Sequence, residues 1–233
     1  MPALKLFLLG QPRFERDGQP LTFDTRKNVA LVAYLALTRD CHSRETLITL
    51  LWPELEPRRA RAVLRRNLSV LRKTLGGKWL VVDGDEIGTD PGADFWLDVD
   101  RFRHLLSICR THGHPDTQVC SQCLDMLAEA AELYRGDLLE GTSLRDSAAF
   151  DEWQFFQTES LRQAFAAALE KLVRGHSARD EYEPAIRFAR RWRVLSFAVL
   201  CFLATHPIGF AQKKPERGGA HAHTRPPFGV QCR

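Results

Sequence analysis

Apolar and polar positions follow different patterns along the chain, and each pattern predicts a different kind of element. Residues 4–23 hold short apolar runs separated by Gly10, Pro12 and the turn pair Asp17-Gly18. This pattern indicates two or three short antiparallel strands. From residue 24 the apolar positions recur at helical spacing instead, so residues 24–38 are expected to form a helix with a broad apolar face.

A second helix is expected over residues 43–52. Ser43 is suited to be its N-cap, and Pro53 is expected to end it. For the first helix, Asp24 or Thr25 can serve as the N-cap. Both helices are short and apolar on one side, so the sequence predicts that they pack into a common core.

Residues 57–75 predict a third helix, in which Pro57 is tolerated in the first turn and Gly76 and Gly77 form the stop. Its apolar positions fall within one narrow arc: Ala60, Leu64, Leu68, Leu71 and Leu75. The opposite side carries Arg58, Arg59, Arg65, Arg66, Arg72 and Lys73, with Ser69 near its centre and Arg61 at the border. One face is therefore apolar, and the other is almost purely cationic.

The cationic side of this helix contains no carboxylate to offset its charge. Solvated helix faces usually mix signs, because oppositely charged pairs four residues apart stabilise a helix and like charges destabilise it. A polyanion would neutralise the repulsion, and arginine is suited to phosphates and to guanine edges. The pattern favours contact with nucleic acid; the alternative is an ordinary solvated helix face.

Residues 78–90 have strand-forming residues on both sides of the turn pair Asp83-Gly84, which predicts a β-hairpin. Strands, two helices, a basic helix and a hairpin in this order are typical of a winged helix-turn-helix. From residue 95 the pattern is helical throughout, with Asp146 suited to cap a long helix. The predicted fold class is an α+β N-terminal winged helix-turn-helix followed by an all-α domain of antiparallel helix pairs.

The chain has 233 residues and a net charge of +4, and its composition is that of a soluble globular protein. Residues 1–94 carry a net positive charge and residues 95–192 a net negative one, so a nucleic-acid footprint is expected in the first part. No secretory signal opens the sequence, which predicts a cytoplasmic location. The apolar run at 194–205 is too short to span a bilayer.

A cluster of cysteine and histidine residues lies within "CRTHGHPDTQVCSQC". Its spacing fits tetrahedral zinc ligation by His112, His114, Cys120 and Cys123, with Cys109 as an alternative ligand. The alternative is a set of reduced cysteines without metal, because the spacing is not that of a standard zinc finger. Structural zinc is therefore the one cofactor that the sequence suggests.

Six stretches in order resemble the bacterial transcriptional activator domain proteins, which are grouped with the Streptomyces antibiotic regulatory proteins: "RKNVALVAYLAL", "SRETLITLLWPE", "ARAVLRRNLSVLRKTLG", "FWLDVDRF", "LYRGDLLEG" and "DSAAFDEWQ". The resemblance covers roughly residues 3–192. It implies an OmpR-like winged helix over residues 1–93 and a tetratricopeptide-like helical domain over residues 94–192. It also implies a regulator that activates transcription at promoters with repeated sites.

The resemblance places the third helix in the major groove of double-stranded DNA. Its groove-facing residues would be Arg58, Arg59, Arg61, Arg65, Arg66, Ser69, Arg72 and Lys73. Arg65, Arg66 and Ser69 are expected nearest the base edges, and the others mostly on phosphates. RNA polymerase and a second copy of the chain, as a homodimer, are further expected partners, and no membrane contact is expected.

The sequence departs from the family pattern after about Trp192. We interpret residues 193–233 as the product of a frameshift that truncates the helical domain, or alternatively as a divergent disordered tail. No motif of nucleotide binding, nucleophilic hydrolysis or metalloprotease chemistry is present, so an enzyme is not expected. The alternative function is a helical-repeat protein-interaction adaptor, a truncated regulator without functional DNA binding.

Overall fold

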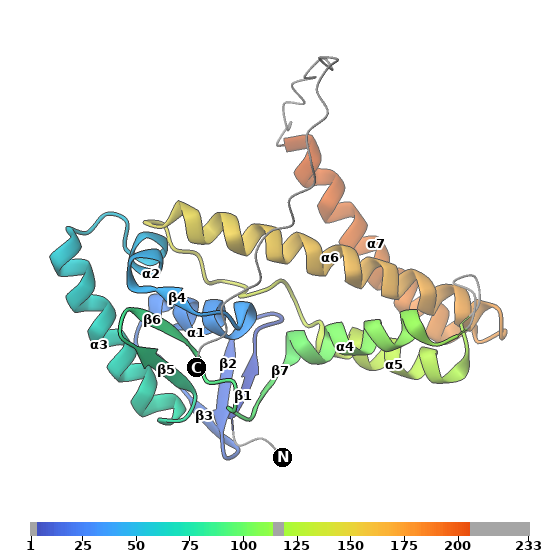
Figure 1. Ribbon diagram of the computed structural model, residues 1–233. Coiled ribbons are helices and arrows are strands. Elements are labelled where there is room, and N and C mark those ends of the chain that lie inside the picture. The colour runs from blue at the N-terminus through green and yellow to red at the C-terminus, as the bar shows by residue number, and fades with distance from the viewer. Residues whose placement is uncertain (1–3, 114–118, 206–233) are drawn as a thin grey trace, which may run out of the picture.

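The computed structural model describes residues 4–113 and 119–205, with side chains to Arg193 (Figure 1). The predicted N-terminal strands are confirmed as the antiparallel series β1 (Leu4–Phe7), β2 (Arg13–Arg16) and β3 (Gln19–Leu21). Asp17 and Gly18 both have positive φ, at 52° and 76°, as a two-residue hairpin turn requires. A fourth strand, β7 (Phe95–Leu97), pairs in parallel with β1 and completes a sheet in the order β3-β2-β1-β7.

The three predicted helices and the predicted hairpin follow the N-terminal strands. The elements are α1 (Arg26–Thr38), β4 (His42–Ser43), α2 (Arg44–Leu51), α3 (Pro57–Leu75), β5 (Leu80–Asp83) and β6 (Glu86–Thr89). Thr25 and Ser43 cap α1 and α2 through their side chains. The hairpin joins β4 in a second sheet, ordered β4-β6-β5. This order and pairing match a winged helix-turn-helix.

The rest of the described chain is helical. Its elements are α4 (Asp98–Thr111), α5 (Ser121–Leu133), α6 (Ala148–Ser177) and α7 (Tyr182–Thr205). Each helix packs against the next one along the chain. The expected cap of the long helix α6 at Asp146 is wrong by one position, because Ser147 accepts the hydrogen bond from the backbone N–H of Phe150.

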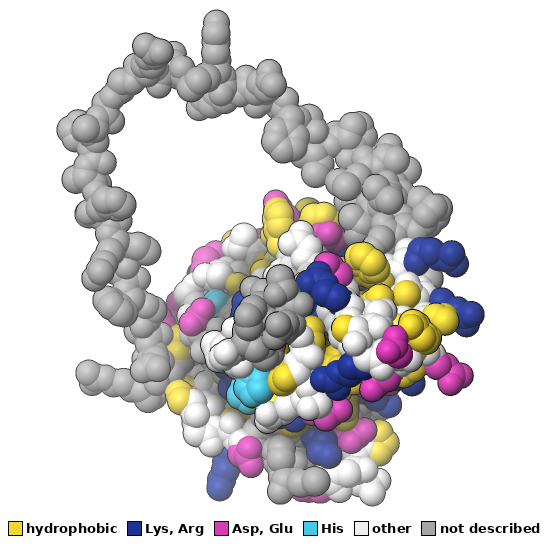
Figure 2. Space-filling view, turned by 90° about the vertical axis from the view of Figure 1, so that its right-hand side faces the viewer, with side chains coloured by type: hydrophobic (Ala, Val, Ile, Leu, Met, Phe, Trp, Pro, Cys, Tyr) yellow, Lys and Arg dark blue, Asp and Glu magenta, His cyan; other side chains and the backbone are white. Residues whose placement is uncertain are grey.

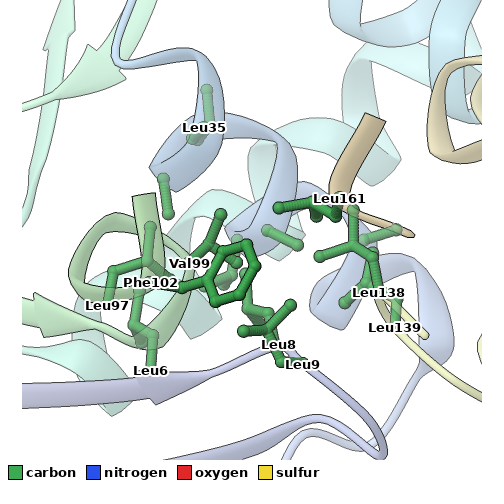
Figure 3. Packing of buried hydrophobic residues seen from close by; sticks show 14 of the residues in the cluster. Leu6, Leu8, Leu9, Leu35, Leu97, Val99, Phe102, Leu138, Leu139 and Leu161 are labelled. Atoms are coloured by element: carbon green, nitrogen blue, oxygen red, sulfur yellow. The ribbon is translucent and has the colours of Figure 1, made fainter. Parts of the chain in front are cut away.

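The two parts share one continuous hydrophobic core. Figure 3 shows Leu8 and Leu9, which follow β1, beside Val99 and Phe102 of α4 and close to Leu138. The backbone also joins the parts, since Leu9 and Leu138 form an antiparallel bridge and Gly10 N–H donates to the Asp137 carbonyl at 2.9 Å. The helical part is therefore docked on the N-terminal part rather than tethered to it.

The start of α6 adds a second contact between the two parts (Figure 1). The Lys27 ammonium pairs with Asp146 at 2.7 Å, and the Tyr34 and Trp153 rings meet with centroids 4.9 Å apart. Ser147 Oγ also donates to the Leu50 carbonyl. Asp146, expected to cap α6, instead pairs with a lysine of α1.

The stretch interpreted as a frameshift product or a disordered tail, residues 193–233, divides into two parts. Residues 193–205 continue helix α7, so a disordered tail from residue 193 is wrong for this part. Residues 206–233 lie outside the described part of the chain. Among the described helices, none is long and apolar enough to cross a membrane.

Candidate nucleic-acid interface

Helix α3 is defined by its sequence at both ends and along its buried face. The Glu56 carboxylate accepts hydrogen bonds from the backbone N–H groups of Arg58 and Arg59, and Pro57 occupies the first turn. Gly76 ends the helix at φ 93°, in the left-handed region that favours glycine. The buried residues are those predicted from periodicity: Ala60, Leu64, Leu68, Leu71 and Leu75. The leucine face is thereby held against the core.

The opposite face of α3 lies open to solvent. All eight predicted contact residues are exposed: Arg58, Arg59, Arg61, Arg65, Arg66, Ser69, Arg72 and Lys73. A shallow depression runs along this face between Arg65, Arg66, Ser69 and Lys73. The structure therefore brings the predicted cations together on one accessible surface, which we call the α3 basic face.

The α3 basic face is largely without internal counter-charge. Within the described part of the chain, Arg61 is the one cation of this face with an ion pair, at 3.4 Å from Glu45, and both side chains are more than half exposed. The end of the molecule formed by α4, α5 and the α6–α7 turn differs, since cationic and acidic side chains intermingle there (Figure 2). The cations of α3 are thus available to an external anion.

The hairpin β5–β6 beside α3 has the opposite charge. Asp83, Asp85 and Glu86 are exposed at its tip, where Gly84 turns the chain with φ 55°. Arg44 at the start of α2 donates to the Gly84 carbonyl at 3.2 Å and lies 3.7 Å from the Asp85 carboxylate. The hairpin is therefore fastened to α2 by its tip, and it presents carboxylates rather than cations.

Asp98, at the start of α4, is a positioning residue that the sequence analysis did not single out. Its buried carboxylate accepts hydrogen bonds of 2.9 Å from the backbone N–H groups of Leu8, Leu9 and Val99, and Arg135 donates to it at 3.2 Å. Burial raises the pKa of this carboxyl, although the backbone donors and Arg135 oppose the shift. The one available signal was its place at a helix start within "FWLDVDRF".

The expected zinc ligands are placed only in part. His112, Cys120 and Cys123 have ligand atoms within 4.8 Å of one another, whereas His114 lies outside the described residues. The buried Cys109 thiol donates to the Cys123 carbonyl at 3.7 Å. Hydrogen bonding from the Cys123 backbone N–H lowers the pKa of Cys120, and burial raises the pKa of Cys123 to about 12.

Comparison with known proteins finds curated relatives of this chain. The transcriptional regulatory protein EmbR of Mycobacterium tuberculosis, and that of Mycobacterium bovis, are each 32% identical over 185 residues, which is 76% of this chain and 44% of the relative. The regulatory protein AfsR of Streptomyces coelicolor is 33% identical over 141 residues, 60% of this chain and 14% of the relative. The resemblance to the antibiotic regulatory proteins is confirmed. No protein-family model matches the sequence.

A solved structure of M. tuberculosis EmbR, in complex with a low-affinity phosphopeptide, shares the fold with a TM-score of 0.57 and 22% identity. The likeness covers 83% of this chain and 60% of that chain. The matched relatives are transcriptional regulators rather than enzymes. This homologue of EmbR and AfsR spans less than half the length of the EmbR relatives that it matches.

Proposed function

We propose that the chain is a sequence-specific DNA-binding transcriptional regulator whose helix α3 enters the major groove of a duplex. The observation that carries the proposal is the α3 basic face, exposed along the helix and nearly free of internal carboxylates, behind which five buried residues fix the helix orientation. Regularly placed cations on a rigid helix suit the phosphates and base edges of a major groove. The homology to transcriptional regulators supports the same conclusion.

Within this proposal the residues divide into two roles. Arg65, Arg66 and Ser69 lie on the middle of the exposed face and contact base edges, while the cations toward the helix ends bind phosphates. The acidic tip of the β5–β6 hairpin would repel phosphate, so α3 rather than the hairpin supplies most of the attraction. Residues 1–93 form the DNA-binding unit in this scheme.

The finer assignments of the function follow from the family. We propose that the regulator is an activator at promoters with repeated sites, where it contacts RNA polymerase and binds as a homodimer. The helical region, residues 94–192, acts as a tetratricopeptide-like domain, which the sequential packing of α4, α5, α6 and α7 supports.

A binding titration on the full chain tests the DNA assignment. The probe is a fluorescent duplex pool of randomised sequence, measured by anisotropy at several salt concentrations. We expect the logarithm of the binding constant to fall linearly with the logarithm of the salt concentration, since each neutralised phosphate releases counterions. The double variant Arg65→Ala, Arg66→Ala is expected to bind about tenfold more weakly or worse. Selection of preferred duplexes from the same pool then tests for loss of specificity.

Arg174→Ala is the matched control, because Arg174 is an exposed arginine on α6 and is paired with Glu170. It should leave both the affinity and the salt slope unchanged. Duplex binding that survives in the double variant and shows no salt dependence would count against the proposal. Absence of duplex binding by the wild-type chain would instead favour the second candidate function, a protein-interaction adaptor built on the groove between α4, α5 and α6.

A further inference from the structure

The end of α4 and the start of α5 bring one imidazole nitrogen and two cysteine sulfur atoms close together. His112 is the C-cap of α4, Cys120 is the N-cap of α5, and Cys123 lies in the first turn of α5. The His112 Nδ1 atom lies 3.3 Å from Cys120 Sγ and 3.4 Å from Cys123 Sγ. These residues belong neither to the α3 basic face nor to the contact between the two parts of the chain.

The spacing of the three atoms matches tetrahedral coordination. Zinc–sulfur bonds of about 2.3 Å and zinc–nitrogen bonds of about 2.0 Å at a tetrahedral angle put nitrogen and sulfur ligands about 3.5 Å apart. Hydrogen bonding explains the convergence less well, because one imidazole nitrogen carries a single proton or a single lone pair. It can thus serve one sulfur at a time, whereas an ion between the three atoms would contact all of them.

The backbone that carries the two cysteines is firmly placed. The Cys123 N–H points to Cys120 Sγ at 3.4 Å, so the cap of α5 sets the cysteine pair. Helix α6 approaches this turn so closely that a Cβ at Gly175 would lie 2.7 Å from a methyl carbon of Leu124 and 3.2 Å from Cβ of Val119. Two of the three ligands are therefore positioned by helix packing.

We propose that His112, Cys120 and Cys123 bind one zinc ion. Two thiolates and an imidazole suit this borderline-soft cation, whereas the hard cations Mg²⁺ and Ca²⁺ prefer oxygen ligands. The ion would fasten the end of α4 to the start of α5 and fix how these helices pack. Since this point lies at the opposite end of the molecule from α3 (Figure 1), zinc stabilises the helical region without contributing to the α3 basic face.

Metal analysis of the reduced, untagged full chain tests the proposal. After removal of metal with a chelator, Zn²⁺ is titrated against a chromophoric competitor, and bound metal is measured after gel filtration. We expect about one zinc per chain and a higher Tm with zinc, because the ion binds the folded state. The variant Cys120→Ser, Cys123→Ser is expected to lose both effects. Cys109→Ala is the control that keeps both, since Cys109 lies outside the convergent group.

Two further measurements keep the test decisive if the double variant does not fold. Co²⁺ added to the wild-type chain should give a sulfur-to-cobalt charge-transfer band, and His112→Ala should weaken zinc binding. Failure of the reduced wild-type chain to retain zinc would overturn the proposal, as would equal zinc retention by the wild type and the folded double variant. A Cys120–Cys123 disulfide that forms in air, in a chain that binds no zinc after reduction, would also overturn it.

Discussion

Helices α3 and α6 are both long helices that bury one apolar face, but they differ in how many of their arginines are paired with carboxylates. Helix α3 exposes a row of arginines on its other side, whereas α6 carries the partly buried Arg162 and the exposed Arg174. On α6 the arginines have carboxylate partners: Arg162 pairs with Asp137 and Glu159, and Arg174 pairs with Glu170. On α3 the arginines have almost none, and Arg61 with Glu45 is the exception among the described residues.

Under the proposed function, pairing of charge, more than its amount, distinguishes the α3 basic face from a solvated helix face. An exposed pair such as Arg174 with Glu170 contributes a few tenths of a kcal/mol, and within the described part of the chain α3 has such a pair only at Arg61. The buried leucines of α3 hold the helix in place with little help from surface ion pairs. Its cations therefore remain available to an external anion. Three tests address the comparison between α3 and α6, and a further one, on a buried carboxylate outside both helices, sets the scale of a buried ion pair.

The largest expected effect comes from the buried carboxylate of Asp98, which pairs with the partly exposed Arg135. Asp98→Ala leaves three backbone N–H groups and the guanidinium without their acceptor, so we expect a loss of about 4 kcal/mol in the free energy of unfolding. Urea denaturation measures it. Asp100→Ala, which removes a surface partner of Arg39, is the control and should cost less than about 1 kcal/mol. Similar losses in both variants would refute the role of Asp98.

The buried side of α3 provides the second test. Leu64→Ala opens a cavity beneath a helix whose leucine is fully buried, and we expect a loss of about 3 kcal/mol in the free energy of unfolding. Ser69→Ala on the exposed side is the control and should change stability by less than about 0.5 kcal/mol. A small effect of Leu64→Ala would mean that the core does not hold α3 in place.

The third test gives α3 the surface chemistry of α6. Ser69→Glu places a carboxylate four residues from both Arg65 and Lys73, which should stabilise the helix by a few tenths of a kcal/mol, about 0.3 per pair. The same carboxylate would repel phosphate, so duplex affinity should fall about tenfold or more. Unfolding and anisotropy titrations on one preparation measure the two changes. Unchanged duplex affinity would show that this face does not meet DNA.

The smallest effect is expected on α6. Arg174→Ala removes an exposed pair four residues apart and should lower the free energy of unfolding by about 0.4 kcal/mol. High salt should reduce the difference between wild type and variant, because it screens exposed charges. A loss of 2 kcal/mol or more, about the cost of a buried contact, would show that α6 surface pairs are stronger than the comparison assumes.

The local sequence was sufficient to predict features that depend only on helical periodicity and on helix capping. The five buried positions of α3, its ends at Pro57 and Gly76, and the cap at Ser43 were predicted correctly. The hairpin at 80–89 was also predicted, because Gly84 permits the tight turn. These features depend on residues within a few positions of one another, and one sequence window contains the information.

Contacts between distant segments were not predictable in this way. β7 pairs with β1 across some ninety positions, and Asp98 accepts hydrogen bonds from Leu8 and Leu9 over a similar separation. Asp146 illustrates the limit: as a sequence it is a good helix cap, yet Ser147 takes that role while Asp146 pairs with Lys27. A local preference of about 1 kcal/mol is easily outweighed when two parts of a chain dock.

By itself, the sequence determined which side of α3 faces inward and which cations share the other side, because a helix repeats every 3.6 residues whatever surrounds it. It also determined that cysteine and histidine gather around positions 109–123. The tertiary structure alone decided that the cationic side stays open and that His112 meets Cys120 and Cys123. Both depend on how separate helices pack, since packing removes some surfaces from solvent and brings the ends of different helices together.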